Sequence, residues 1–133
     1  MRAGVAGAGV FGGYHASKYA ADPRCDFAGV FDPVHDHAEA LCASHGGEAF
    51  ASLHDLIDAV DVLTVASPAV FHHDAARRAL SAGKAVLVEK PLAATLEDAR
   101  DLVALAKSKG AVLQVGHQER FVFEAMGLFR DDL

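Results

Sequence analysis

Three glycines near the amino terminus have the spacing of a phosphate-binding loop. Gly7, Gly9 and Gly12 form the pattern G-x-G-x-x-G directly after the apolar run 3–6. In such a loop the first glycine permits a tight turn, the second lets the backbone approach a pyrophosphate, and the third lets the helix pack closely on the strand. The new helix offers unpaired N–H groups to phosphate oxygens. The spacing predicts a dinucleotide site, and a plain strand-to-helix turn is the alternative.

An acidic residue follows the glycines at the distance that such a site requires. Asp32 comes directly after a second apolar run, 27–31. An acid about 20 residues beyond the last glycine accepts hydrogen bonds from the adenosine ribose. Its charge would repel a 2′-phosphate, and residues 33–36 contain no Lys or Arg to bind one. The sequence therefore predicts NAD in preference to NADP. Asp32 is also a good helix N-cap with Pro33 as the first helical residue, and the two roles are compatible.

The composition is typical of a soluble, single-domain chain. It has 133 residues, a formal net charge of −6 and a hydrophobic content of 52%. An acidic chain without a basic patch argues against a nucleic-acid surface. No apolar run approaches the ~18 residues needed to cross a bilayer, and no signal peptide precedes the first strand. Cys25 and Cys42 each stand in an apolar or helical context, so we expect free thiols and a cytoplasmic location. They do not form C-x-x-C, so no redox role is predicted.

Apolar runs alternate with helical patterns along the chain. Runs that are apolar on successive residues are typical of parallel strands covered on both faces, and they fall at 3–6, 26–31, 48–50, 60–66, 85–88 and 112–115. Repeated βαβ units predict an α/β fold with a doubly wound, mostly parallel six-stranded sheet. This is the Rossmann fold, with right-handed crossovers and strand order 3-2-1-4-5-6.

Capping residues mark the helices between these strands. Helix starts are indicated at Asp32, Ser52 and Thr95, and helix ends at Gly46, Gly83 and Gly110. A further helix is predicted over 71–82. The helix predicted over 96–109 has one apolar face, formed by Leu96, Ala99, Val103 and Ala106.

Three further segments have recognisable patterns: residues 66–72 read A-S-P-x-x-x-H, residues 89–91 read E-K-P, and residues 116–121 read G-x-x-x-R-F. These segments resemble motifs of the Gfo/Idh/MocA oxidoreductases, a family that includes glucose–fructose oxidoreductase and inositol dehydrogenase. The first is similar to the stretch after the family's fourth strand. His15 also stands where the family often has a histidine. The resemblance covers almost the whole chain.

The resemblance implies hydride transfer between NAD and a hydroxyl of a sugar, cyclitol or sugar nucleotide. It implies a dinucleotide-binding domain over residues 1–120. Residues 121–133 would begin the link to a C-terminal domain that supplies the substrate pocket, further catalytic groups and usually the homo-oligomer contact. Whether the chain is a natural protein or part of a longer one is left open.

Lys90 is the predicted catalytic residue. A lysine at a strand end can polarise a substrate hydroxyl and stabilise the developing alkoxide, and the family's E-K-P lysine takes that kind of role beside the nicotinamide. Pro91 restricts the preceding backbone to extended conformations, and the resemblance allows a cis bond there. A surface lysine is the alternative. The predicted cofactor contacts are Gly7, Gly9, Val10, Phe11, Gly12, Asp32, Ser67, Pro68, His72, Glu89, Lys90, His117 and Arg120.

Other interpretations remain open at several of these residues. Ser67 and Pro68 are also typical of a helix start, His72 of an exposed helix face, and residues 117–120 of a polar loop. No metal site is predicted, because the histidines at 35, 37, 72 and 73 lie on different elements without ligand spacing. A dinucleotide-binding regulatory or sensor module without turnover is the alternative function, since fold alone does not separate it from an enzyme.

Overall fold

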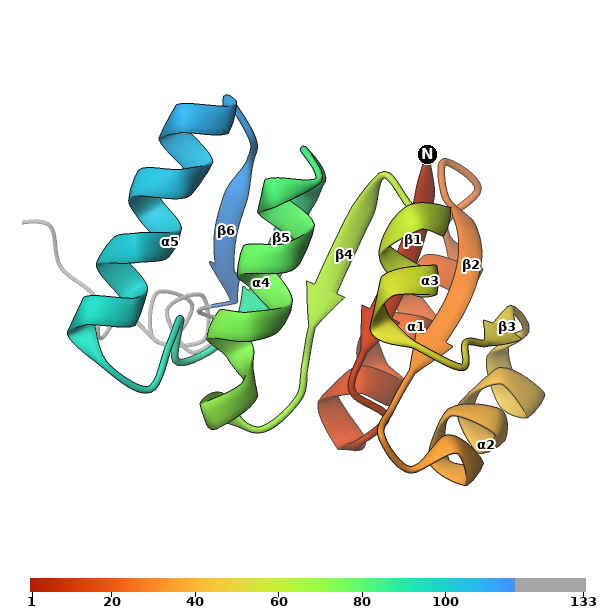
Figure 1. The fold of residues 1–133 in the computed structure, drawn as a ribbon. Helices are drawn as coiled ribbons and strands as arrows, with labels where there is room; N and C mark the ends of the chain where they lie inside the picture. The colour runs from red at the N-terminus through yellow and green to blue at the C-terminus, as the bar shows by residue number, and fades with distance from the viewer. Residues whose placement is uncertain (117–133) are drawn as a thin grey trace, which may run out of the picture.

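The computed structural model describes residues 1–116, so the predictions for His117, Arg120 and 121–133 lie outside the described residues. Six parallel strands form one sheet in the order β3-β2-β1-β4-β5-β6, as predicted (Figure 1). The strands are β1 (Arg2–Ala6), β2 (Asp26–Phe31), β3 (Glu48–Ala49), β4 (Val62–Val65), β5 (Ala85–Glu89) and β6 (Leu113–Gly116). The helices are α1 (Val10–Ala21), α2 (His35–His45), α3 (Leu53–Ala59), α4 (His72–Ser81) and α5 (Leu96–Lys109), with a 3₁₀ turn (Ala69–Phe71) before α4.

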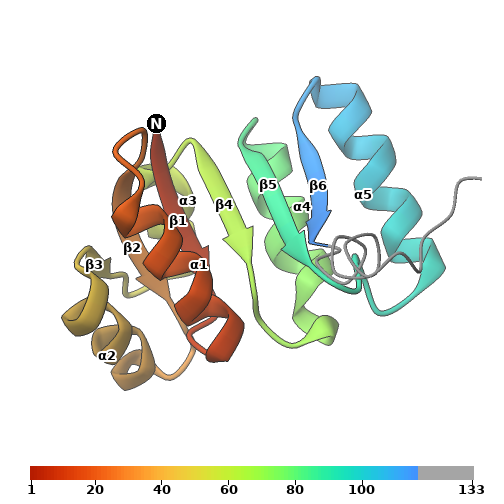
Figure 2. The same cartoon turned by 180° about the vertical axis from the view of Figure 1, so that it is seen from behind.

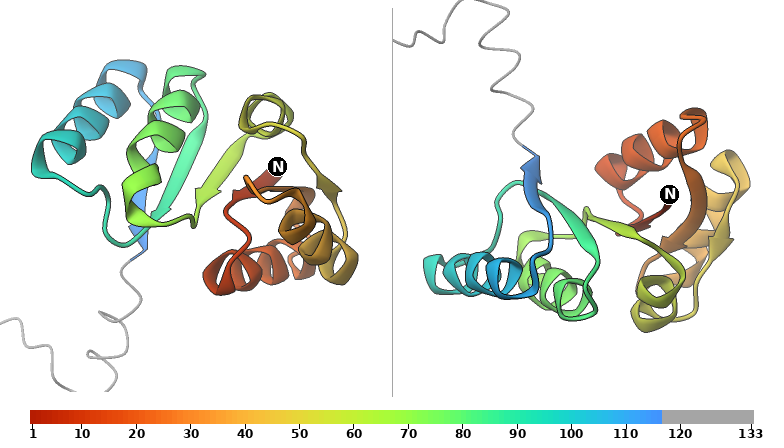
Figure 3. Two further views of the ribbon diagram at one scale, coloured as in Figure 1. Left: turned by 60° about the horizontal axis from the view of Figure 1, so that its bottom comes forward. Right: turned by 90° about the horizontal axis from the view of Figure 1, so that it is seen from above.

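The helices form a layer on each face of the sheet. Helices α3, α4 and α5 lie in front of it in Figure 1, and α1 and α2 come forward when the molecule is turned (Figure 2). The two layers separate clearly in the views of Figure 3. None of the helices in residues 1–116 has the length and apolar character to cross a membrane.

Each face of the sheet has its own hydrophobic core. Val5 and Val30 pack with Ala16 and Ala38 beneath α1 and α2. The larger core lies beneath α3, α4 and α5 and includes Leu56, Leu63, Val65, Leu80, Val88 and Leu102. Successive strand residues point to opposite faces, so a strand buried on both sides is apolar at every position.

Two of the predicted helix starts are confirmed and one is wrong. Ser52 Oγ accepts from Asp55 N–H at 3.0 Å, and Thr95 Oγ1 accepts from Asp98 N–H at 3.1 Å. Asp32 does not cap α2, because that helix begins only at His35. Its N-cap residue is Val34, and no side chain caps the helix there. The Asp32 carboxylate is instead engaged by backbone N–H groups at the mouth of the site, as described below.

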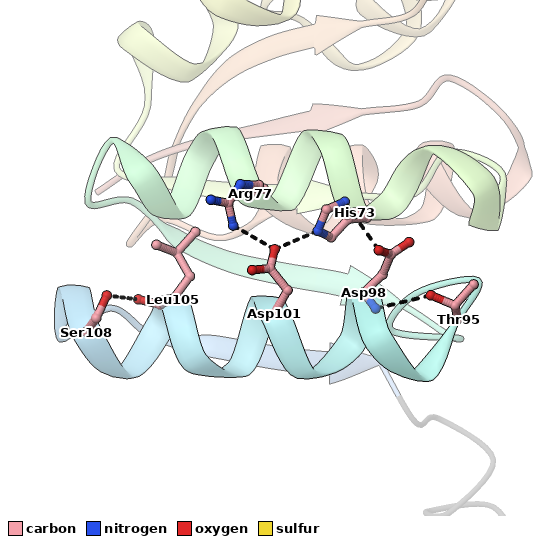
Figure 4. A network of polar contacts seen from close by, with 7 residues as sticks. All are labelled: His73, Arg77, Thr95, Asp98, Asp101, Leu105 and Ser108. Atoms are coloured by element: carbon pink, nitrogen blue, oxygen red, sulfur yellow. Dashed lines mark hydrogen bonds and ion pairs between the residues drawn. The ribbon is translucent and has the colours of Figure 1, made fainter.

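A polar network joins α4 to α5 at the surface. Asp101 Oδ2 accepts from His73 Nε2 at 2.7 Å and from Arg77 Nη1 at 2.6 Å (Figure 4). The hydrogen bond from His73, together with Arg77, lowers the pKa of the Asp101 carboxyl. This stabilisation is present at neutral pH and is lost as the pH falls through the lowered pKa.

The predicted apolar face of α5 is partly wrong. Leu102 and Ala106 are the buried residues of this helix, whereas Leu96 and Val103 are 66% and 45% exposed. The helix is rotated so that Asp101 reaches α4. Leu102, which shares the helical spacing of Ala99 and Ala106, takes the central core position with no exposed surface.

Candidate functional site

A cavity of about 570 Å³ opens where the first, second and fourth strands end. Open parallel sheets bind ligands at the carboxyl ends of their strands, where the strand order reverses. Here that point lies between β1 and β4. The volume falls within the roughly 300–1,000 Å³ range of small-molecule and cofactor sites. The lining residues are Gly7, Ala8, Gly9, Val10, Phe11, Asp32, His37, Ala66, Ser67 and Pro68.

Two glycines of the loop are required by the protein itself. Gly7 has a φ of +111°, and a Cβ there would stand 2.6 Å from the backbone N of Ser67. A Cβ on Gly12 would collide with the carbonyl oxygen of Gly7. The loop therefore doubles back tightly between β1 and α1, with the β4 end packed against it.

Gly9 differs from its two neighbours in the motif. It precedes α1 with an ordinary φ of −82°, and a Cβ built on it meets no protein atom within 4 Å. The fold itself thus has no need of glycine here. A side chain would project into open space beside the first turn of α1, where backbone N–H groups lack helical partners and where no side chain caps the helix. Open space beside unpaired backbone N–H groups is suited to an anionic group such as a pyrophosphate.

The Asp32 carboxylate holds the glycine loop. Its Oδ2 accepts from Ala8 N–H and its Oδ1 from Val34 N–H, both at 2.8 Å. Its side chain is 15% exposed, so part of it faces the cavity, and His37 Nδ1 lies 3.9 Å from Oδ1. Each carboxylate oxygen can accept more than one hydrogen bond. Asp32 therefore supports the loop and still has acceptor capacity for a ligand hydroxyl.

A second, more apolar cavity of about 280 Å³ adjoins the first. Gly7, Asp32, Ser67 and Pro68 line both cavities. Within residues 1–116, Ser67 Oγ is the buried side-chain polar atom without a hydrogen-bond partner. The apolar walls of the second cavity come mainly from Phe31, Pro33, Val34, Leu53, Pro68 and Phe71.

The end of β5 lies beside this region, on the far side of β4. Glu89 is buried there, and its Oε1 contacts His15 Nε2 at 2.5 Å. Gly116 of the neighbouring strand leaves room for the other carboxylate oxygen, since a Cβ there would stand 3.2 Å from Glu89 Oε2. Lys90 follows and is exposed, and its bond to Pro91 is cis. The buried pair thus ties α1 to the strand that carries Lys90.

His72 lies behind the cavities and does not line them. It is 1% exposed, so the alternative of an exposed helix histidine is wrong. Its Nδ1 lies 2.7 Å from the Pro91 carbonyl oxygen, and its Nε2 lies 2.6 Å from the Ser67 carbonyl oxygen.

Sequence reasoning missed two features of the site. The hydrogen bond from Ala8 N–H to Asp32 has no sequence signal, because it is made by a backbone group. His37 lines the larger cavity and lies one helical turn after Pro33. Its position in the first turn of α2, next to the predicted ribose-binding Asp32, could have identified it from the sequence. Among residues 1–116, no His, Cys, Asp and Glu side chains gather in a set that would hold a metal ion.

Fold and site together define a nucleotide-binding α/β domain, and comparison with known proteins gives its family. The chain belongs to the GFO_IDH_MocA family, an oxidoreductase family with an NAD-binding Rossmann fold, which it matches over residues 1–117.

Among individual proteins, UDP-N-acetylglucosamine 3-dehydrogenase of Acidithiobacillus ferrooxidans is 38% identical over 120 residues, which are 90% of this chain and 38% of that protein. Its crystal structure matches with a TM-score of 0.86, covering 90% of this chain and 39% of that one. Glucose-6-phosphate 3-dehydrogenase of Bacillus subtilis is 34% identical over 90% of this chain and 34% of its own length.

The structure of GenD2 from gentamicin A biosynthesis, solved in complex with NAD, is 36% identical with a TM-score of 0.83. The match covers 87% of this chain and 34% of GenD2. This chain therefore spans little more than a third of the length of these relatives. The predicted family, fold and cofactor class are confirmed.

Proposed function

We propose that this site binds NAD and that Gly9 is the point at which the pyrophosphate meets the chain. The proposal depends on the open space beside Gly9. A Cβ built on Gly9 meets no protein atom within 4 Å, so the fold does not require glycine at this position. The pyrophosphate would lie over the first turn of α1 and accept from its N–H groups. Val10 and Phe11, which begin that turn and line the larger cavity, would flank it.

The two cavities divide the adenosine half of the ligand between them. Asp32 lines both, so its carboxylate lies where a ribose between pyrophosphate and adenine would place its hydroxyls. The smaller cavity has the apolar walls that a purine ring needs. Ser67 Oγ is a buried hydroxyl without a protein partner and stands ready to bond a polar group of the ligand.

Lys90 is the residue that we assign to the chemistry. When bound, NAD supplies the acceptor for a hydride from a substrate C–H. The Lys90 ammonium group would polarise the hydroxyl on that carbon and stabilise the negative charge that develops on its oxygen, and a base of the proposed substrate domain would take the hydroxyl proton. Glu89, held by His15, fixes the end of β5 from which Lys90 projects. Of the predicted contacts outside the described residues, His117 and Arg120 follow β6 directly and would border the nicotinamide.

Sugars and sugar nucleotides are the proposed substrates, since the relatives named above include dehydrogenases for UDP-N-acetylglucosamine and glucose-6-phosphate. We propose that residues 1–120 form the cofactor domain and that 121–133 begin the link to a substrate domain. We place the protein in the cytoplasm, where the free thiols Cys25 and Cys42 would remain reduced. Homo-oligomer formation stays a prediction.

Gly9→Ala tests the proposed cofactor site. We expect the Kd for NAD, measured by calorimetry, to rise at least about tenfold, which corresponds to about 1.4 kcal/mol. The thermal midpoint of the free protein should change little, because the new methyl group meets no protein atom.

Gly13→Ala is the matched control, because its Cβ would lie 3.5 Å from Leu41 Cδ2, an ordinary contact. It should leave the Kd unchanged. A Gly9→Ala protein that binds NAD as tightly as the parent would refute the assignment.

Asp32 is proposed to select NAD over NADP. In thermal unfolding with equal concentrations of the two dinucleotides, NAD should raise the midpoint more, because tighter binding stabilises the folded state by mass action. Asp32→Asn removes the charge that repels a 2′-phosphate and should narrow the difference between the two shifts. If NAD and NADP raised the thermal midpoint of the parent protein equally, Asp32 would not select between the two dinucleotides.

A further inference from the structure

His72 connects two loops of the site that are far apart in the sequence. One ring nitrogen contacts the carbonyl of Ser67, in the loop that leaves β4, and the other contacts the carbonyl of Pro91, in the turn that leaves β5. The first loop lines both cavities, and the second carries Lys90. A single buried ring thus joins the wall of the cofactor site to the segment that presents the proposed catalytic lysine.

Both contacts join a ring nitrogen to a backbone oxygen. A carbonyl oxygen can only accept a hydrogen bond, so the ring is the donor, and the tautomer decides which nitrogen carries the hydrogen. At 2.6 and 2.7 Å the contacts are short, and the ring that makes them is only 1% exposed. Replacing the ring by an apolar group would remove its polar contact from both carbonyls.

The histidine next to His72 in the sequence has its partners on α5. The neighbouring His73 donates to Asp101 and approaches Asp98, both on α5, in the network that joins the two helices. Within residues 1–116, no carboxylate forms an ion pair with His72. The ring is therefore committed to the two backbone carbonyls, which is the arrangement expected of a group that holds backbone in place.

We propose that His72 is a positioning residue that sets Lys90 relative to the bound dinucleotide, with Nε2 holding the cofactor loop and Nδ1 holding the lysine turn. The proposal rests on the proposed function, because it takes the two loops to be the cofactor wall and the catalytic turn. It assigns His72 a role through other residues, with no contact to the cofactor.

Two isosteric variants separate the two halves of the link. In His72→Gln the side-chain amide nitrogen lies close to the position of Nε2, so the bond to Ser67 can persist while that to Pro91 is lost. In His72→Asn the amide nitrogen lies close to the position of Nδ1, so the bond to Pro91 can persist while that to Ser67 is lost. His73→Asn is the matched control, since it removes a neighbouring histidine from α4 outside the two loops.

Calorimetry with NAD and hydrogen exchange read by mass spectrometry measure the effects on the chain itself. His72→Asn should raise the Kd for NAD about fivefold or more and speed exchange in residues 66–71. His72→Gln should leave the Kd within about twofold and speed exchange only around residues 89–94. His73→Asn should change neither the Kd nor exchange in either loop.

A purely structural role would give a different pattern. If both variants lowered the thermal midpoint, raised the Kd equally and sped exchange along all of α4, His72 would be an ordinary core residue and the proposal would fail. Unchanged exchange in both loops would also overturn it. If the parent chain did not bind NAD, the proposed function would fail, yet the exchange pattern would still report whether His72 holds the two loops.

Discussion

Lys90→Ala should lower kcat by at least about tenfold, because a group that stabilises charge or moves a proton in the transition state commonly contributes 10²–10⁴-fold. The Kd for NAD should change little. The measurement is NADH formation, made in the longest form of the protein that the gene encodes and with a panel of hexoses, cyclitols and nucleotide sugars. A fall in kcat without a rise in Kd identifies an interaction made in the transition state.

Lys84→Ala is the matched control for this experiment. Lys84 directly precedes β5, whereas Lys90 directly follows it, so the two lysines stand at opposite ends of one strand. Removing Lys84 changes the net charge by the same amount and leaves the site intact. An unaffected kcat in Lys90→Ala, or an equal loss in Lys84→Ala, would dismiss the catalytic role of Lys90.

Gly12→Ala should unfold the protein or destabilise it by at least about 3 kcal/mol, a large part of the 5–15 kcal/mol that holds a typical domain together. The added Cβ would collide with the Gly7 carbonyl oxygen, which is backbone and has no free direction to move. The β1–α1 loop would have to open, and Gly7 cannot retreat because it already packs on the backbone of Ser67. Urea denaturation followed by circular dichroism measures the change.

Gly13→Ala is again the control for that variant. It makes the same substitution one residue further along the same helix, where the Cβ fits. Alanine is about 1 kcal/mol better than glycine within a helix, so this variant should be equally stable or more stable than the parent. A folded Gly12→Ala protein with a parental urea midpoint would show that the loop is looser than the structure describes.

Gly9 and Gly12 belong to the same G-x-G-x-x-G motif but have different roles. The motif predicts that Gly9 lets the backbone approach a pyrophosphate and that Gly12 lets the helix pack on the strand. Only the structure separates a glycine that the fold requires, Gly12, from one at which a side chain would fit, Gly9. The two alanine substitutions therefore have different expected effects. Gly9→Ala should weaken NAD binding and leave stability unchanged, whereas Gly12→Ala should destabilise the fold.

Local chemistry explains why much of the fold could be predicted. Ser52 and Thr95 cap their helices through bonds to residues three positions away, so the necessary information lies within one helical turn. The sheet order follows from repeated βαβ units and their fixed handedness. The predicted start of α2 at Asp32 was wrong, because the Asp32 carboxylate accepts a hydrogen bond from Ala8 N–H, which is distant in the sequence.

The fold, the glycine loop and the family could be predicted from the amino-acid sequence, because turns, caps and strand periodicity depend on neighbouring residues. The side chains that meet across the sheet could be identified only in the folded molecule. His15 and Glu89 are 74 residues apart yet in contact, His72 joins two separate loops, and α5 turns Leu102 inward while Asp101 bonds to α4. Such contacts depend on the packing of whole elements against one another, and no local pattern encodes that packing.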